Sequence, residues 1–287
     1  MDLGIGLPTS GRQADPEAIV RVALAAERAG LGAVWAFERL LRPAEAVFAG
    51  TDQSMPLPDN NALVYDPLET LAYVAAKTST IRLGTSVVDA LFHSPVVLAK
   101  RLATLDRLSG GRAVIGLGQG WMQQEFDATG IPARRRGAGF EEHLAAMRAC
   151  WGPDPVRFDG RFYTIPESEI APKPTGLTLL AGAAAPAAIE RAARLGLGLT
   201  VVVFAWDQLR QSVETYRKGG QGPLVAQVNG VITDRPLDER MPLTGSPEQV
   251  AEDLAEARAL GVDHVFWHPF DGDPDEMVGR IQQLNTH

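Results

Sequence analysis

The residues whose types could do chemistry in this chain stand at or just after the ends of apolar runs. Glu38 follows "AVWAF", Asp89 and His93 follow "IRLGTSVV", and His268 ends "VDHVFWH". Carboxylates and imidazoles bind many metals, but no pair among these four residues has an HxH or HxxxH spacing. We therefore expect no metal site.

Covalent catalysis by a side chain is also not indicated. The sequence has no GxSxG motif, and its lysines fall in expected helices or loops, away from expected strand ends. The single Cys150 lies in the helix-like stretch "EEHLAAMRACW", where we do not expect a reactive thiol. One cysteine cannot form an internal disulfide, so a reducing cytoplasm is the expected compartment.

Small residues dominate two other expected strand ends, in the runs "GLGQGW" and "AGAAAP". Main chain without bulky side chains suits a flat ring system, because backbone N–H groups can then reach the carbonyl groups of the ring. The second run also opens an expected helix, where free N–H groups favour a phosphate. Close packing or tight barrel closure would explain the same residues. The candidate contacts are Gly118, Gln119, Gly120, Gly182, Ala183, Ala184 and Ala185.

Eight apolar runs, rich in β-branched residues, are the elements that would position these side chains. They cover residues 3–7, 33–37, 81–87, 113–118, 177–182, 198–203, 224–230 and 262–268. Helix-like stretches separate them. Five of these begin with Asp-Pro or Ser-Pro, in which the side chain caps the helix and proline has no N–H to satisfy. This alternation predicts one (β/α)8 TIM barrel over residues 1–287, and an open doubly wound sheet is the alternative.

Two segments, residues 42–65 and 152–176, interrupt this alternation with proline, glycine and polar residues. Each follows a strand or its helix, so both are candidates for loops on the active face of the barrel. The first directly follows the second expected strand, and we expect it to cover the barrel mouth.

Charge and hydropathy narrow the range of partners. The formal net charge of −8 argues against nucleic acid or an anionic membrane surface as a partner. The N-terminal "MDLGIGLPTS" lacks the features of a signal peptide, and no run is long enough to span a membrane. We expect a cytoplasmic protein that acts on a small molecule.

Three long phrases resemble the luciferase-like flavin and deazaflavin oxidoreductases. They are "DPLETLAYVAAKTSTIRLGTSVV", "SPVVLAKRLATLDRLSGGRAVIGLGQGW" and "RFDGRFYTIPESEIAPKP". The resemblance implies a barrel that binds coenzyme F420 or FMN at the carboxyl ends of its strands, commonly as a homodimer. It also implies a non-proline cis peptide bond between Ser86 and Val87, behind the ring of the coenzyme.

The stretch after the second expected strand departs from the deazaflavin pattern, which often has an Asp-His pair there. This chain has Glu38 and Arg39 in "AFERLLRP". The resemblance gives Glu38 a place near the coenzyme, whereas Arg39 cannot act as a neutral base and would hold a negative charge. Proton transfer would then fall to Glu38 or His268, although His268 could equally be a structural residue.

We therefore expect an F420-dependent oxidoreductase that transfers a hydride to or from a small organic substrate. The phrase "ERLLRP" resembles a subgroup that uses the deazaflavin, which favours F420 over FMN. An FMN-dependent monooxygenase is the first alternative. A barrel that binds the coenzyme without catalysis is the second.

Overall fold

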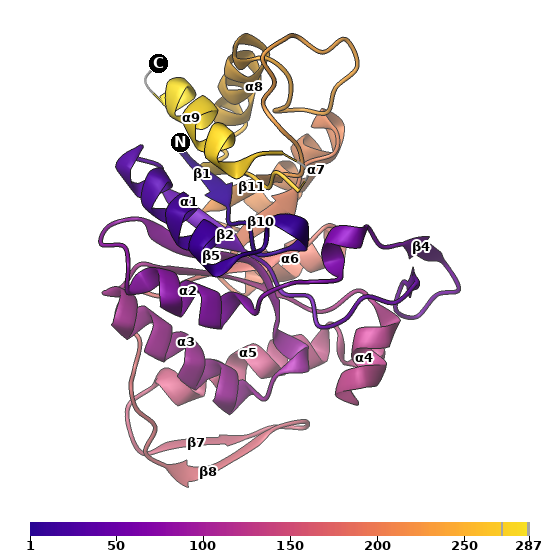
Figure 1. The fold of residues 1–287 in the computed structure, drawn as a ribbon. Helices are drawn as coiled ribbons and strands as arrows, with labels where there is room; N and C mark the ends of the chain where they lie inside the picture. Colours follow the sequence, from indigo (N-terminus) through magenta and orange to yellow (C-terminus); the bar gives the residue numbers. More distant parts are fainter. Residues whose placement is uncertain (271, 286–287) are drawn as a thin grey trace.

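A closed barrel of eight parallel strands forms the centre of the computed structural model, which describes residues 1–270 and 272–285 (Figure 1). The strands span Asp2–Gly6 (β1), Ala33–Ala36 (β2), Arg82–Asp89 (β5), Ala113–Gly118 (β6), Thr178–Gly182 (β9), Gly198–Val202 (β10), Leu224–Val228 (β11) and His264–Trp267 (β12). Each overlaps one of the eight runs that the sequence indicated, although β1 begins one residue before its run and β5 extends two residues beyond its run. Because β1 pairs with both β2 and β12, the sheet is closed, and the open-sheet alternative is wrong.

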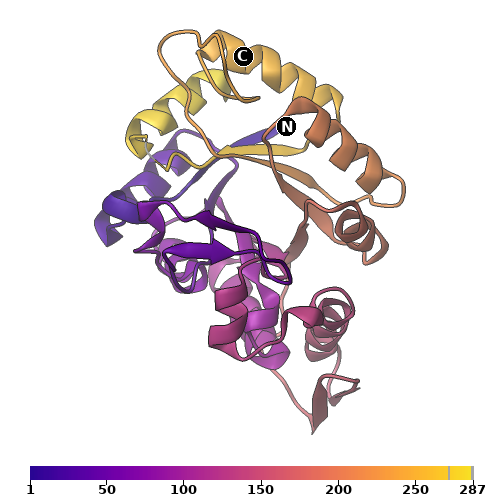
Figure 2. The ribbon, with the colours of Figure 1, turned by 90° about the vertical axis from the view of Figure 1, so that its right-hand side faces the viewer.

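Helices surround the barrel, as Figure 2 shows from the side on which β4 and α4 lie. They span Pro16–Arg28 (α1), Pro67–Ala75 (α2), Pro95–Ser109 (α3), Gln123–Thr129 (α4), Ala138–Trp151 (α5), Pro186–Arg194 (α6), Trp206–Arg217 (α7), Pro247–Ala259 (α8) and Pro274–Asn285 (α9). Short 3-10 turns cover Gly11–Gln13, Asp59–Asn61, Ala90–Phe92 and Ala133–Arg135.

The expected helix caps form at four of the five proline-led starts. The side chains of Asp15, Asp66, Ser246 and Asp273 accept N–H groups from the first turn, and Ser246 forms a capping box with Gln249. At Ser94 the side chain does not cap α3, although Pro95 still begins that helix. The proline position therefore marked the start more reliably than the capping side chain.

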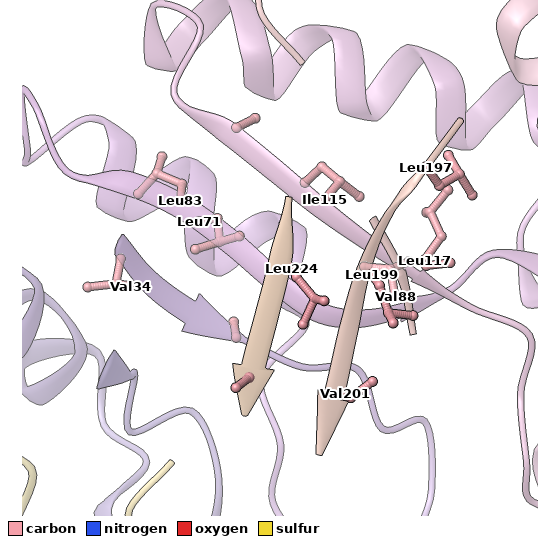
Figure 3. Close-up of a cluster of buried hydrophobic side chains, with 14 of the residues drawn as sticks. Val34, Leu71, Leu83, Val88, Ile115, Leu117, Leu197, Leu199, Val201 and Leu224 are labelled. Carbon is pink, nitrogen blue, oxygen red and sulfur yellow. The ribbon is translucent and has the colours of Figure 1, made fainter. Parts of the chain in front are cut away.

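Aliphatic side chains fill the layer between the strands and the helices (Figure 3). Val34, Leu83 and Ile115 project outward from three neighbouring strands, and Leu71 of α2 belongs to the same buried cluster. The interior of the barrel holds a separate cluster, in which Trp35 stacks on Phe266 with ring centroids 4.6 Å apart. The barrel is therefore closed by packed side chains beneath its mouth.

The first irregular segment, residues 42–65, contains an antiparallel hairpin of Glu45–Val47 (β3) and Ser54–Pro56 (β4). It packs beside α4, where the Ala49 N–H donates to the Trp121 carbonyl oxygen over 2.7 Å. Ala46, Leu57 and Met122 form a small buried cluster of their own. The segment is thus attached to the β6 side of the mouth.

The second irregular segment, residues 152–176, does not belong to the active face. It forms a hairpin of Val156–Asp159 (β7) and Thr164–Ser168 (β8), which lies outside the helices, below α3 and α5 in Figure 1. The Glu142 side chain in α5 accepts the N–H groups of Phe162 and Tyr163 at the tip. The expectation of an active-face loop was wrong here because the segment follows α5 and returns the chain towards the start of β9.

Two further sequence expectations concern membranes and the cysteine. No helix within the described residues is long and apolar enough to cross a membrane. Cys150 is fully buried in α5, and burial raises the pKa of its thiol above the ordinary value.

Candidate active site

We call the end of the barrel that holds the carboxyl ends of the strands, beyond the Trp35–Phe266 stack, its mouth. On one side, Phe37 and His268 meet edge to face with ring centroids 5.2 Å apart, and Phe270 stacks on the imidazole. This side of the mouth is therefore aromatic.

A polar floor is made by Ser86 of β5, Thr200 of β10, Gln227 of β11 and Asn229, which follows β11. The Ser86 hydroxyl donates to Gln227 Oε1 over 2.8 Å and lies 3.1 Å from Thr200 Oγ1. The Gln227 amide in turn donates to Asn229 Oδ1. Sequence reasoning indicated Ser86 but missed the other three. A signal for two of them was present, because Thr200 and Gln227 are single polar residues within the apolar runs "GLTVVV" and "LVAQV".

The Ser86–Val87 peptide bond is cis, as the family resemblance implied. The register of β5 against β6 shifts between Thr85 and Val88, so the main chain bulges at this point. Both residues of the bond are half-buried at the edge of the polar floor.

The side chain of Val87 occupies space that glycines leave free. A Cβ at Gly182 would lie 2.6 Å from Val87 Cγ1, and a Cβ at Gly118 would lie 2.6 Å from Val87 Cγ2 and would collide with Asp89 Oδ1. The sequence suggested open main chain for a ring, and that interpretation was wrong at these two glycines. They admit Val87 and Asp89 instead, and contact of either glycine with a coenzyme stays a prediction.

Glu38 follows β2 and is almost fully buried. Its Oε2 accepts the Asp89 N–H over 2.7 Å, and its Oε1 lies 2.7 Å from His93 Nε2. Both carboxylate oxygens are therefore engaged by the chain itself. A direct catalytic role for Glu38 stays a prediction, and the geometry favours a role in positioning Asp89 and His93.

Asp89 is a buried carboxyl group at the end of β5 that sequence reasoning considered only as a metal ligand. Its Oδ1 accepts the Gly120 N–H over 2.8 Å. Burial, reinforced by the negative charge of Glu38, raises the pKa of Asp89 to about 7. Asp89 is thus the carboxyl group near the mouth that can hold a proton at neutral pH.

Arg39 does not present a free positive charge. Its Nη1 donates to Glu125 Oε2 over 2.7 Å, and the side chains of the two residues are only 11% and 1% exposed. The other Glu125 oxygen accepts the Leu40 N–H, and the guanidinium lies 5.2 Å from the centre of the Trp121 ring. Because Glu125 neutralises it, binding of an anionic substrate by Arg39 stays a prediction without support from the geometry.

His268, unlike Arg39, has no hydrogen-bond partner for its side chain among the described residues. Its side chain is buried against Gly6, and neither ring nitrogen has a partner among the described residues. Burial lowers the pKa of His268 to about 4, so the imidazole is neutral at pH 7. A buried imidazole with unpaired nitrogens is suited to receive a polar group of a ligand.

The remaining predicted contacts lie around the ends of β6 and β9. Gly120 has a positive φ of 76° and packs against Phe92 and Phe126, while Gln119 Oε1 accepts the Gly137 N–H. The Ala183 N–H reaches the Thr200 carbonyl oxygen. Ala184 and Ala185 are exposed, and Ala185, at the N-cap position before α6, provides no capping side chain. The start of α6 thus remains open to an anion.

No group of three or more His, Cys, Asp or Glu side chains within residues 1–270 and 272–285 has the arrangement of a metal site. His93 and Asp89 are joined through Glu38, whereas His268 lies with the aromatic residues.

Two curated relatives show how far the similarity extends. An uncharacterised protein of Mycobacterium tuberculosis (strain H37Rv) is 37% identical over 188 residues, which cover 64% of this chain and 66% of that protein. The F420-dependent glucose-6-phosphate dehydrogenase of Kineococcus radiotolerans is 32% identical over 201 residues, covering 68% of this chain and 55% of the enzyme. The chain thus matches somewhat less than two thirds of the length of the first relative and about half of the second.

Solved structures share the fold at low sequence identity. The coenzyme F420-dependent tetrahydromethanopterin reductase of Methanopyrus kandleri has a TM-score of 0.76 at 18% identity, with 98% of this chain and 97% of that chain covered. The oxygenating constituent of 3,6-diketocamphane monooxygenase of Pseudomonas putida, solved with FMN, has a TM-score of 0.75 at 15% identity and covers 99% and 97% of the two chains.

The family described as luciferase-like monooxygenase matches residues 1–223, which include the bulge at Ser86–Val87 and the ends of β6 and β9. The strand order, the cis bond and this match agree with one another. The chain belongs to the luciferase-like monooxygenase family.

Proposed function

We propose that this protein is an oxidoreductase that uses coenzyme F420 to transfer a hydride to or from a small organic substrate. When bound, the deazaflavin would supply or accept the hydride at its ring. The observation that carries the proposal is the presence, at the carboxyl ends of the strands, of both the polar floor of Ser86, Thr200 and Gln227 and the unpaired imidazole of His268.

The residues of the mouth fit a flat ring with polar edges. The buried nitrogens of His268 would gain a partner from such a ring, and the cis bulge at Ser86–Val87 would lie behind it. The open start of α6 at Ala184 and Ala185 would hold a phosphate group through main-chain N–H groups. The ring and the phosphate in these proposed contacts would both come from the bound coenzyme.

The residues of the chain would position the reactants and exclude water. The hairpin β3–β4 is attached beside α4 at the rim, and the aromatic side of the mouth would take the apolar part of the substrate. His268, which is uncharged at neutral pH, would accept or donate a hydrogen bond with the bound ring.

The choice of F420 over FMN rests on the curated relatives that are named as F420-dependent. An FMN-dependent monooxygenase is the second candidate, because a structural neighbour of that kind was solved with FMN. A barrel that binds the coenzyme without turnover is the third. The homodimer and the cytoplasmic location expected from the sequence stay predictions, and light scattering of the purified chain would test the first.

Equilibrium binding to F420 and to FMN, measured separately by fluorescence on the purified chain, tests the proposal. We expect micromolar or tighter binding of F420 and much weaker binding of FMN. The variant His268→Ala should weaken the binding of F420, whereas Asp52→Asn at the exposed turn of the hairpin should not. Tight binding of FMN alone would contradict the choice of coenzyme. Binding of F420 with no change in its absorbance for any tested alcohol, aldehyde, ketone or activated alkene would favour the non-catalytic barrel.

A further inference from the structure

We propose that Asp89 is the catalytic acid–base residue of this site, and that it gives a proton to the substrate oxygen or takes it back. This assignment rests on the proposed hydride transfer and adds the group that completes it. The sequence placed that task on Glu38 or His268.

The position of Asp89 places its carboxyl group inside the mouth. Val114 belongs to the interior cluster of the barrel, and alternate residues of a strand share one face, so Gly116 and Gly118 also face the interior. Asp89 Oδ1 stands where a side chain at Gly118 would project. The carboxyl group therefore lies on the inner side of β6, next to Val87 of the cis bulge.

The hydrogen bonds of Asp89 leave one oxygen for a substrate. Oδ1 accepts the Gly120 N–H, and the Asp89 main-chain N–H is fixed by Glu38. Within residues 1–270 and 272–285, the hydrogen bond of the Asp89 carboxyl group is the one at Oδ1, and none reaches Oδ2. The residue is only 6% exposed, so its carboxyl group is held in place and largely shielded from water.

Burial and the charges around Asp89 together raise its pKa. Glu38, which follows β2, and Glu125 in α4 both disfavour a second negative charge, while Arg39 acts in the opposite direction from its ion pair with Glu125. His93 contacts Glu38 Oε1, whereas the Asp89 N–H donates to Glu38 Oε2. Burial is the largest cause and raises the pKa of Asp89 to about 7, so the protonated and ionised forms are both accessible near pH 7.

The other two candidates are less suited to the task. Both oxygens of Glu38 are already bonded within the chain, and His268 is neutral with a pKa of about 4. His268 could not donate a strongly acidic proton at pH 7 without first being charged in a buried position. Asp89 is therefore the group that the geometry leaves for proton transfer.

The proposed step balances for the reduction of a carbonyl substrate. The carbonyl carbon would gain a C–H bond from a hydride that the reduced coenzyme supplies, and the π electrons of the C=O bond would move to its oxygen. That oxygen would take the proton of Asp89, which gives an alcohol and an Asp89 carboxylate; with the reduced coenzyme starting as its ring anion, loss of the hydride would leave neutral oxidised F420, and water would return a proton to Asp89. In the oxidation of an alcohol the carboxylate takes the hydroxyl proton as the hydride leaves.

Infrared difference spectroscopy on the ligand-free chain tests the protonation of Asp89 without any activity. With ¹³C-labelled aspartate, we expect one protonated carboxyl signal that is lost as the pH rises through about 7. It should be absent in Asp89→Asn and should move to lower pH in Glu38→Gln, which removes the neighbouring charge. Asp52→Asn is the control and should leave the signal unchanged. A spectrum of Asp89→Asn identical to that of the wild type would overturn the assignment.

Turnover of reduced F420 with a panel of aldehydes and ketones tests the chemical step. The kcat/KM of the wild type should fall above pH 7, and Asp89→Asn should lose about 100-fold or more and show no such fall. Glu38→Gln should shift the fall to lower pH, which a purely structural role of Asp89 would not produce. Retention of the wild-type pH profile in Asp89→Asn would overturn the step. Failure of F420 to bind would instead overturn the proposed function, and with it the proton-transfer step of Asp89. The infrared titration of Asp89 uses no coenzyme, so its result would still stand.

Discussion

Replacement of Asp89 by Asn should make the protein more stable at alkaline pH while it removes the proposed acid. The ordinary pKa of the group is 3.8, and burial beside Glu38 raises it to about 7 in the folded chain. The unfolded chain therefore releases this proton first as the pH rises. The corresponding stability is fully present below pH 3.8 and is lost as the pH rises through 7.

The size of the effect follows from that shift. One pKa unit corresponds to about 1.4 kcal/mol, so ionisation of Asp89 should cost the wild type about 4 kcal/mol of unfolding free energy by pH 9. Asn cannot ionise, and its side-chain oxygen can still accept the Gly120 N–H. The stability difference between Asp89→Asn and the wild type should therefore grow by about 4 kcal/mol between pH 4 and pH 9.

Guanidinium chloride denaturation, followed by tryptophan fluorescence at pH values from 4 to 9, measures this difference. Subtracting the unfolding free energy of the wild type from that of the variant at each pH cancels the titration of every group that the substitution leaves unperturbed. Asp52→Asn, at an exposed position, should follow the wild-type curve. Parallel curves for Asp89→Asn and the wild type would refute the reasoning, because they would mean that Asp89 ionises in the folded chain as easily as in the unfolded one.

Three further predictions concern the surroundings of the site. Glu125→Gln should lower the unfolding free energy by about 2 kcal/mol, because it leaves the mostly buried Arg39 charge without its partner; Asp275→Asn, in the exposed pair with Arg21, should cause no measurable change in the same denaturation assay. Gly118→Ala should cost about 1 to 3 kcal/mol, because its Cβ meets Val87 and Asp89. Gly279→Ala in α9 has open space at its Cβ and should be neutral or add up to about 1 kcal/mol, so equal thermal shifts for these two variants would contradict the packing argument. In the Asp89→Asn variant, which lacks the opposing gain from protonation of Asp89, stability should also fall as the pH drops from 6.5 to 4, by about 3 kcal/mol for each histidine that is held neutral with a folded pKa near 4, as His143 and His268 are. A denaturation midpoint that stays constant over that range would rule out their buried neutral state.

The secondary structure could be predicted because its signals are local. Each of the eight strands overlaps an apolar run of a few residues to within two residues at either end, and the Asp-Pro and Ser-Pro pairs mark helix starts within one turn. The failure at residues 152–176 has the same origin, because composition showed an irregular segment but not on which side of the helices it would lie. The cis bond at Ser86–Val87 was predicted only through the family resemblance, since no local pattern specifies it.

The sequence by itself determined the order of strands and helices, the family, and the set of polar residues delivered to the strand ends. Only the tertiary structure decided what those residues can do. Arg39 is neutralised by a residue 86 positions away, and the charge that acts on Asp89 comes from Glu38, 51 positions earlier in the chain. Protonation depends on burial and on neighbouring charges within a few ångströms, and both are set by strands that meet only when the barrel closes.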